Sequence, residues 1–205
     1  MAAKQLERAI LMDVTVLKEM IEDQIERYRS ILGLPRRSNY TLIQDTEYLL
    51  KIVKNNSSLN DMEVLICKEF NIKKNTFNYV LPTVERANLI MKTKNNIRLT
   101  YAGEQFIQTK NISYVVKGFI ENYFGLLEAL LLIAENPLDS RKEIFLKWVT
   151  LYEAEFGNRA KSTHKSQFNI ILRYLIGFDL LFIDSSGDFK VNYDLLSESK
   201  QIAIF

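Results

Sequence analysis

The sequence predicts a mainly α-helical protein with small β-hairpins (an α+β fold), arranged as two similar units in tandem after a long N-terminal helix. Apolar residues recur at helical spacing over most of the 205 residues. Two short stretches instead alternate apolar and polar residues around a polar turn, which is typical of paired strands. These stretches, and the helices before them, match each other at an offset of about 91 residues. The second half of the chain is therefore expected to repeat the architecture of the first.

The first 32 residues are expected to form one helix, the main part of an N-terminal segment over residues 1–35. Apolar residues from Leu6 to Leu32 follow one another at steps of three or four, which places them on one face. Gly33 and the proline two residues later are expected to end the helix, and residues 36–39 to form an exposed loop. The apolar stripe fits self-association through a helical seam, and it fits equally well packing across the chain's own two units.

Residues 40–111 are expected to form the first unit, of three helices and a hairpin. Asp45 and Asn60 are candidate N-caps of its first two helices, and Asn75 or Thr76 is expected to open the third. After the third helix the apolar period changes from helical to alternating. A Lys-Asn-Asn turn then separates two short strands.

Residues 114–205 are expected to form the second unit in the same order. A strongly apolar helix over residues 114–135 comes first. A second helix restarts near Asp139, and a third is capped by Ser162 or Thr163 after a basic loop. A hairpin around a Ser-Ser-Gly-Asp turn follows. The expected strands of the two hairpins cover residues 89–93, 97–101, 180–184 and 189–193.

The match between the two units extends to single residues. Asn78 corresponds to Asn169, and each follows a phenylalanine in the third helix of its unit. One extra residue in the second hairpin shifts the offset to 92. The run over residues 97–101 then matches the run over residues 189–193 as apolar, basic, apolar, polar and tyrosine. This ordered match indicates an internal repeat.

Leu99, Thr100 and Gly103 follow the third helix of the first unit at the spacing Leu-Thr-x-x-Gly. In this respect the chain resembles the winged-helix family, in which the wing strand often leads through such a step into a closing helix. The second unit departs from the pattern, because the corresponding run from Tyr193 to Leu195 has no matching glycine. The resemblance implies two winged-helix units in tandem.

Composition limits the classes of function. The net charge of +2 is not the strongly basic balance of a protein that coats nucleic acid, so DNA binding would need a local patch. Cys67 is the single cysteine, which fits a reducing cytoplasm, where association with the nucleoid is expected. The longest apolar run, residues 129–134, is far shorter than the roughly 20 residues that span a bilayer, so no membrane partner is expected.

The sequence predicts no enzyme activity, no cofactor and no metal site. His164 and Cys67 are single residues of their kinds, whereas a metal site usually needs three or four such ligands. Asp184, Asp188 and Lys190 have the residue types of a metal-dependent nuclease. They lie within one hairpin turn, however, where aspartate is favoured for turn formation.

Double-stranded DNA is the expected partner. In a winged helix the third helix can enter the major groove, while the hairpin lies against the backbone. Cations on these elements would contact phosphates, and polar side chains would meet base edges. The candidate DNA-binding residues are Lys73, Lys74, Asn78, Arg86, Lys94 and Arg98 in the first unit, and Arg159, Lys161, His164, Lys165, Gln167, Asn169 and Arg173 in the second.

Two hypotheses of function follow. The first is a non-catalytic DNA-binding protein, either a regulator or a subunit or recognition module of a larger prokaryotic DNA-processing or defence assembly. The second is a protein-binding adaptor. Tandem winged-helix proteins of this length resemble the kleisin-interacting family, which dimerises and binds the linker subunit of chromosome-organising ATPase complexes. The near-neutral charge and the apolar segment over residues 114–134 favour this second hypothesis.

Overall fold

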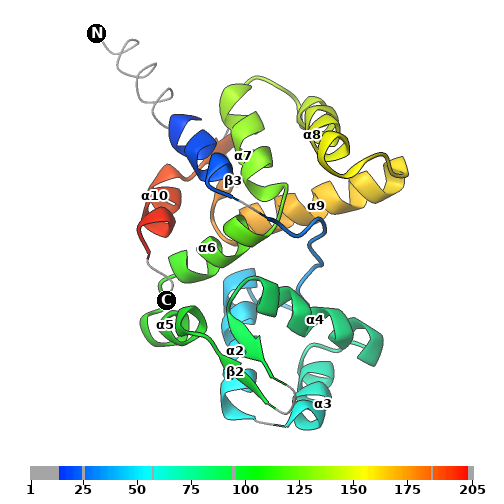
Figure 1. Cartoon of the computed structure of the whole chain (residues 1–205), viewed down its shortest axis with the longest axis vertical. Helices are drawn as coiled ribbons and strands as arrows, with labels where there is room; N and C mark the ends of the chain where they lie inside the picture. The colour runs from blue at the N-terminus through cyan, green and yellow to red at the C-terminus, as the bar shows by residue number, and fades with distance from the viewer. Residues whose placement is uncertain (1–13, 25, 57, 94–95, 186, 203–205) are drawn as a thin grey trace.

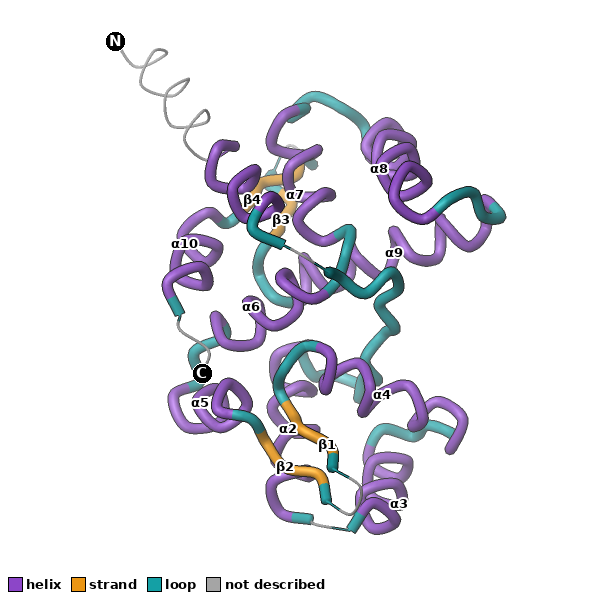
Figure 2. Tube along the Cα trace, viewed as in Figure 1, coloured by secondary structure: helices purple, strands orange, loops and turns teal. Residues whose placement is uncertain are grey.

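A computed structural model describes residues 14–24, 26–56, 58–93, 96–185 and 187–202 (Figure 1). The protein is mainly helical and contains two small antiparallel hairpins (Figure 2), which confirms the predicted fold class. Residues 14–22 are also helical. The further elements are α2 (Leu42–Asn55), α3 (Leu59–Glu69), α4 (Lys74–Arg86), β1 (Ile90–Lys92), β2 (Ile97–Leu99), α5 (Tyr101–Thr109), α6 (Ser113–Asn122), α7 (Leu126–Glu135), α8 (Arg141–Phe156), α9 (Lys161–Gly177), β3 (Leu181–Ile183), β4 (Phe189–Val191) and α10 (Tyr193–Gln201).

The order of three helices, a hairpin and a helix occurs twice, in α2 to α5 (the first repeat) and in α7 to α10 (the second repeat). Helix α6 lies between them (Figure 1). At the join of third helix and hairpin, Leu89 N–H donates to a helix carbonyl five residues back at 3.0 Å, and Leu180 N–H does so at 2.9 Å. The residues just before these leucines, Asn88 and Asp179, both have positive φ, 54° and 59°. The predicted offset of 91 residues therefore joins positions with the same backbone geometry.

The N-terminal helix is much shorter than predicted, because helical structure ends at residue 22. The part of the prediction that concerns residues 1–13 lies outside the described residues. Leu17 of the apolar stripe and the nearby Met20 are buried within the chain itself. Ion pairs hold this helix to α7 and α10, through Lys18 and Glu135 at 2.7 Å and through Glu19 and the lysine at position 200 at 2.9 Å. The described part of the stripe thus packs across the chain's own elements.

Residues 26–37, here called the strap, are non-helical and bond with both repeats and with α6. Tyr28 N–H donates to the Asn122 carbonyl at 2.7 Å, so its backbone is satisfied without a helix. Arg27 forms an ion pair with Glu128 of α7 at 2.5 Å, and both side chains are largely buried. The apolar residues of this segment have helical spacing, but these tertiary interactions stabilise a non-helical conformation instead.

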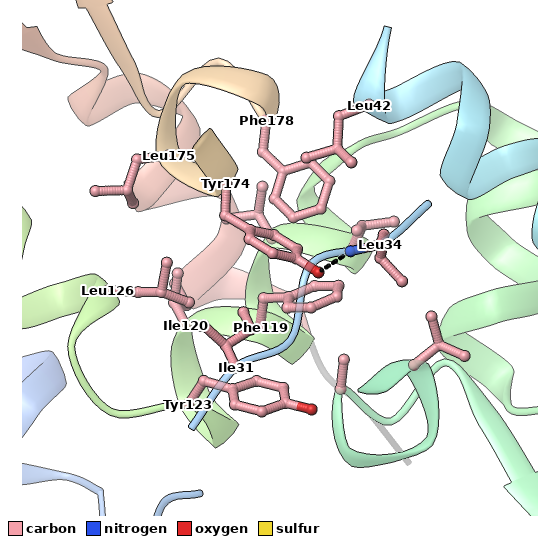
Figure 3. Close-up of a cluster of buried hydrophobic side chains, with 14 of the residues drawn as sticks. Ile31, Leu34, Leu42, Phe119, Ile120, Tyr123, Leu126, Tyr174, Leu175 and Phe178 are labelled. Carbon is pink, nitrogen blue, oxygen red and sulfur yellow. Dashed lines mark hydrogen bonds between the residues drawn. The ribbon is translucent and has the colours of Figure 1, made fainter. Parts of the chain in front are cut away.

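The Tyr174 side chain of α9 holds the middle of the strap (Figure 3). Its hydroxyl donates to the Leu32 carbonyl at 2.7 Å and accepts from Leu34 N–H at 3.0 Å. The ring packs with Phe119 and Phe178 at centroid distances of 4.9 and 5.4 Å. Burial raises the pKa of Tyr174 far above its usual range, so the phenol stays neutral.

The predicted helix over residues 114–135 is two helices, because the chain turns between α6 and α7. Gly125 stands at the turn with φ of 101°, a conformation that glycine adopts without strain. Its N–H donates to the Glu128 carboxylate at 2.6 Å, and its carbonyl accepts from Trp148 Nε1 at 3.2 Å. A continuous apolar run cannot mark such a break by periodicity.

The prediction that Asp45 caps α2 is wrong. The cap is Thr41, whose side chain accepts a hydrogen bond from a backbone N–H in the first turn. Asp45 is instead 1% exposed and pairs with the Arg37 guanidinium at 2.7 Å. That guanidinium also lies 4.0 Å from the centre of the Tyr48 ring. The prediction of an exposed loop over residues 36–39 is therefore wrong for Arg37.

Other helix starts differ from the prediction by a few residues. Helix α3 is capped by Ser58 instead of Asn60, and α8 is capped by Ser140. Helices α4 and α9 begin at Lys74 and Lys161, and neither has a side-chain cap. In the described part of the chain, no helix is long and apolar enough to cross a membrane.

Candidate nucleic-acid interface

The third helices of the two repeats, α4 and α9, begin on the same side of the molecule and run inward (right-hand side of Figure 1). Each buries one face through equivalent apolar residues, such as Phe77 and Phe168. The opposite faces meet solvent. Most of the candidate DNA-binding residues lie on these exposed faces.

In the first repeat, Lys73, Lys74 and Asn78 are exposed at the beginning of α4. Lys74 forms an ion pair with Glu63 of α3 at 2.9 Å, which offsets its charge. Arg86 lies at the other end of the helix, with its guanidinium 4.6 Å from the centre of the Tyr28 ring in the strap. Arg86 is therefore separated from the other three residues.

The first hairpin carries exposed basic residues. Lys92 and Arg98 are exposed on its two strands, and the Arg98 guanidinium contacts the Met91 sulfur at 3.6 Å. Lys94 lies outside the described residues. The hairpin can therefore offer cations to a phosphate backbone.

The second repeat has a groove between α8 and α9, with a volume of about 560 Å³. Cations from both helices and apolar side chains line this α8–α9 groove. Its residues are Arg141, Lys142, Phe145, Leu146, Lys161, Lys165, Phe168 and Asn169. None of these residues is acidic. The groove therefore combines a positive potential with an apolar surface.

Lys161 and Lys165 are exposed and form no ion pair with the described residues. Arg141 is held in place, because it donates to Asn169 Oδ1 at 2.9 Å. The first turn of α9 has no side-chain cap, so its free N–H groups add to the positive potential. The two lysines, Arg141 and the free N–H groups of α9 can thus attract an anion to this end of the second repeat.

His164 does not face solvent, so the prediction that it contacts DNA is wrong. Its side chain is 2% exposed, and its ring lies 5.4 Å from the Tyr152 ring. Nδ1 lies 3.5 Å from the Glu153 carboxylate. The cause is helical spacing, because His164 is one turn before the buried Phe168 and shares its face.

The remaining predicted residues of the second repeat are spread along α9. Arg159 is exposed in the loop before the helix, and Gln167 is half-buried. Arg173 is exposed two turns beyond Lys165, about 12 Å along the helix axis. Arg159 and Arg173 therefore lie toward opposite ends of α9.

The second hairpin has a different surface. Phe182 and Ile183 are 51% and 57% exposed, and Leu138 nearby is 96% exposed. Lys190 faces Asp184 at 3.5 Å, so its charge is offset. The Asp184 carboxylate also stabilises the turn, because it accepts a hydrogen bond from Asp188 N–H at 3.0 Å. Strand β3 of this hairpin therefore exposes an apolar surface, which is not suited to phosphate.

Sequence reasoning missed the contribution of α8 to the groove. Arg141 and Lys142 lie one turn before Phe145 and Leu146, so all four project on the same side of the helix. That spacing was a visible signal. The pairing of this face with α9 is a tertiary contact that the spacing does not reveal.

Among the described residues, no group of three or more His, Cys, Asp or Glu side chains could hold a metal ion. Comparison of the chain with models of protein families, with curated proteins and with solved structures found no match. The exposed cations and apolar side chains described above are therefore the features that indicate function.

Proposed function

We propose that this chain is a non-catalytic, DNA-binding protein built from two winged-helix units in tandem, α2 to α5 and α7 to α10. The observation that carries the proposal is that Lys161 and Lys165, on the exposed face of α9, form no ion pair with any residue that the structure describes. The element order and the hairpin after each third helix support the winged-helix assignment.

The duplex would lie along the side of the molecule where α4 and α9 begin. Lysines of α9 would contact phosphates, and Asn78 of α4 would be available to base edges. Arg98 on the first hairpin would contact the phosphate backbone of the same duplex. Because the overall charge is only +2, such a local patch must supply the electrostatic attraction.

Binding without chemistry suits a regulator or a recognition module. We propose the role of a DNA-recognition subunit in a prokaryotic DNA-processing or defence assembly in the cytoplasm, or of a regulator. In either role the protein would hold the duplex and leave any reaction to a partner.

The test is fluorescence anisotropy with a labelled DNA duplex over a series of salt concentrations. We expect binding that weakens as salt rises, because each phosphate contact releases counterions. The double substitution Lys161→Ala with Lys165→Ala should reduce the log–log salt slope by about 1.8, at about 0.9 per contact. The absence of duplex binding at low salt would contradict the proposal.

The matched control removes two other exposed lysines, Lys51 and Lys110, which both pair with Glu47 away from the groove. It lowers the net charge by the same amount. Its salt slope should stay near that of the unmodified protein. If the control weakens binding as much as the groove variant does, the effect comes from net charge and not from the groove.

A second candidate function, a protein-binding adaptor, is favoured by the exposed apolar side chains on and near strand β3. Leu138, Phe182 and Ile183 present large apolar side chains to solvent, and such patches often mark protein-binding sites. A pull-down from the native host, with and without Phe182→Ser and Ile183→Ser, tests this candidate. A partner that is lost with both substitutions would support it, and an unchanged set of partners would count against it.

A further inference from the structure

The α8–α9 groove has a shape and an apolar surface that duplex binding does not require. A helix face that meets a duplex contacts charged phosphates and polar base edges. Here Phe145 and Leu146 lie between the cations instead, and the space of about 560 Å³ is within the range of sites for small organic groups. We propose that this groove holds an unpaired nucleotide of a DNA strand, an inference that rests on the proposed DNA-binding function.

The aromatic side chain is positioned to stack on a base. Phe145 is half-buried, and its ring packs in a tilted arrangement against the buried Phe168 ring, with 5.4 Å between the ring centres. Leu146 beside it is 50% exposed. Proteins that bind single strands combine a cationic groove with aromatic rings on which bases stack. The groove has both components.

The cations stand on both walls of the groove. Arg141 and Lys142 come from α8, and Lys161 and Lys165 come from α9. The phosphates on either side of a stacked base can therefore be contacted from opposite walls. The bond between Arg141 and Asn169 holds one of these cations in a fixed position before a ligand arrives.

Other ligands fit the groove less well. A peptide would need acidic groups on both flanks of an apolar anchor, because all four charged lining residues are basic. A free nucleotide would leave the cations of one wall without a phosphate. A strand with an unpaired base supplies an aromatic group and phosphates on both sides.

The test compares three labelled DNAs by anisotropy: a duplex, the same duplex with a single-stranded overhang, and an oligo-dT strand. We expect the overhang to bind at least about fivefold more tightly than the blunt duplex, from stacking of one base. Phe145→Leu keeps an apolar side chain and removes the aromatic face. It should abolish this gain, measured as the ratio of overhang affinity to blunt-duplex affinity in the same variant.

A 2-aminopurine at the first unpaired position gives an independent readout. Its fluorescence should be quenched by stacking in the unmodified protein, and this quenching should be lost in Phe145→Leu. Leu59→Ala, on an exposed residue of α3, is the control and should change neither readout. Thermal unfolding of each variant checks that it is folded.

Any of four outcomes would overturn the inference. Equal affinity for blunt and overhanging duplex, or an overhang gain that survives Phe145→Leu, would refute it and leave duplex binding intact. The overhang could also be displaced by a free nucleoside triphosphate or by an acidic amphipathic peptide. If Phe145→Leu lowers the affinity for that competitor, the groove binds the competitor and not an unpaired nucleotide. Failure to bind any of the DNAs would refute the proposed function as well.

Discussion

The two repeats have the same order of helices and strands but differ in the surroundings of their equivalent lysines. Lys74 and Lys165 occupy equivalent positions in the third helices, 91 residues apart. Lys74 pairs with Glu63, whereas Lys165 faces the α8–α9 groove without an acidic partner among the described residues. The same backbone architecture therefore presents different surface charges in the two repeats. The position of a lysine within the repeat does not determine its role.

In the hairpins, it is the second repeat whose basic residue, Lys190, has an acidic partner. The first exposes Arg98, and the second exposes Phe182 and Ile183. In our account the helix face of the second repeat and the hairpin of the first contact DNA. The second hairpin is then free for a protein partner.

The largest expected effect concerns the start of the closing helix, where the first repeat has Gly103 and the second has Leu195. A Cβ at Gly103 would lie 2.2 Å from the Leu89 carbonyl oxygen, a backbone atom that cannot easily move. We expect Gly103→Ala to lower the free energy of unfolding by about 3 kcal/mol, despite the better helix propensity of alanine. Urea unfolding measures this.

Gly33→Ala is the matched control, because its Cβ would meet nothing closer than 3.9 Å. We expect a change within about 1 kcal/mol. If Gly103→Ala is tolerated equally well, the close approach of α5 to the Leu89 carbonyl is not a requirement of the first repeat.

A smaller effect is expected at Tyr174, which corresponds to Thr83 at the offset of 91 residues. Tyr174→Phe leaves the Leu32 carbonyl and the Leu34 N–H without their partner, and should cost about 1–3 kcal/mol of unfolding free energy. Tyr79→Phe, on an exposed tyrosine of α4, should cost little. Equal costs in urea unfolding would mean that the strap is not held by this hydroxyl.

The same residue gives a pH dependence. Burial raises the pKa of Tyr174 above its unfolded value of about 10, so the folded state binds the proton more tightly. Its contribution is fully present below pH 10 and is lost as the pH rises past 10. Stability should therefore fall at alkaline pH, and less steeply in Tyr174→Phe. Identical slopes in both proteins would show that another group causes the fall.

The equivalent lysines allow a direct contrast in DNA binding. Lys165→Ala should reduce the log–log salt slope by about 0.9, the value for one phosphate contact. Lys74→Ala should change the slope by much less, because Glu63 already offsets that charge. Equal changes in an anisotropy titration would erase the proposed difference between the repeats.

The smallest effects are expected at the second hairpin. Phe182→Ser and Ile183→Ser remove exposed side chains, so unfolding free energy should change by no more than about 0.5 kcal/mol each. Affinity for duplex DNA should stay within about twofold, whereas Arg98→Ala should lower it. A clear loss of DNA affinity in the serine variants would place the second hairpin on the DNA.

The repeat could be predicted because it depends on local patterns. Buried residues such as Phe77 and Phe168 recur at helical spacing, and the change to alternation marks each hairpin. The predicted hairpins are confirmed, with Ile90 opposite Leu99 and Leu181 opposite Val191. Each strand is three residues long and thus shorter than predicted, because the last residues of the second and fourth predicted strands cap or begin α5 and α10.

The rest depends on tertiary contacts that spacing does not encode. Helical periodicity continued past residue 22, but the strap gains more from its buried ion pair and from Tyr174. His164 was placed with its basic neighbours, although its position one turn before Phe168 indicates burial. The groove was missed because it needs two helices that are adjacent only in the folded chain.

Lysine-reactivity footprinting tests the central claim, that DNA lies on the exposed face of α9. An amine-reactive reagent and mass spectrometry would report the reactivity of Lys161 and Lys165 with and without a saturating duplex. We predict strong protection of both, with Lys51 and Lys110 in the first repeat unchanged. Unchanged reactivity of Lys161 and Lys165, or equal protection of all four, would contradict this account.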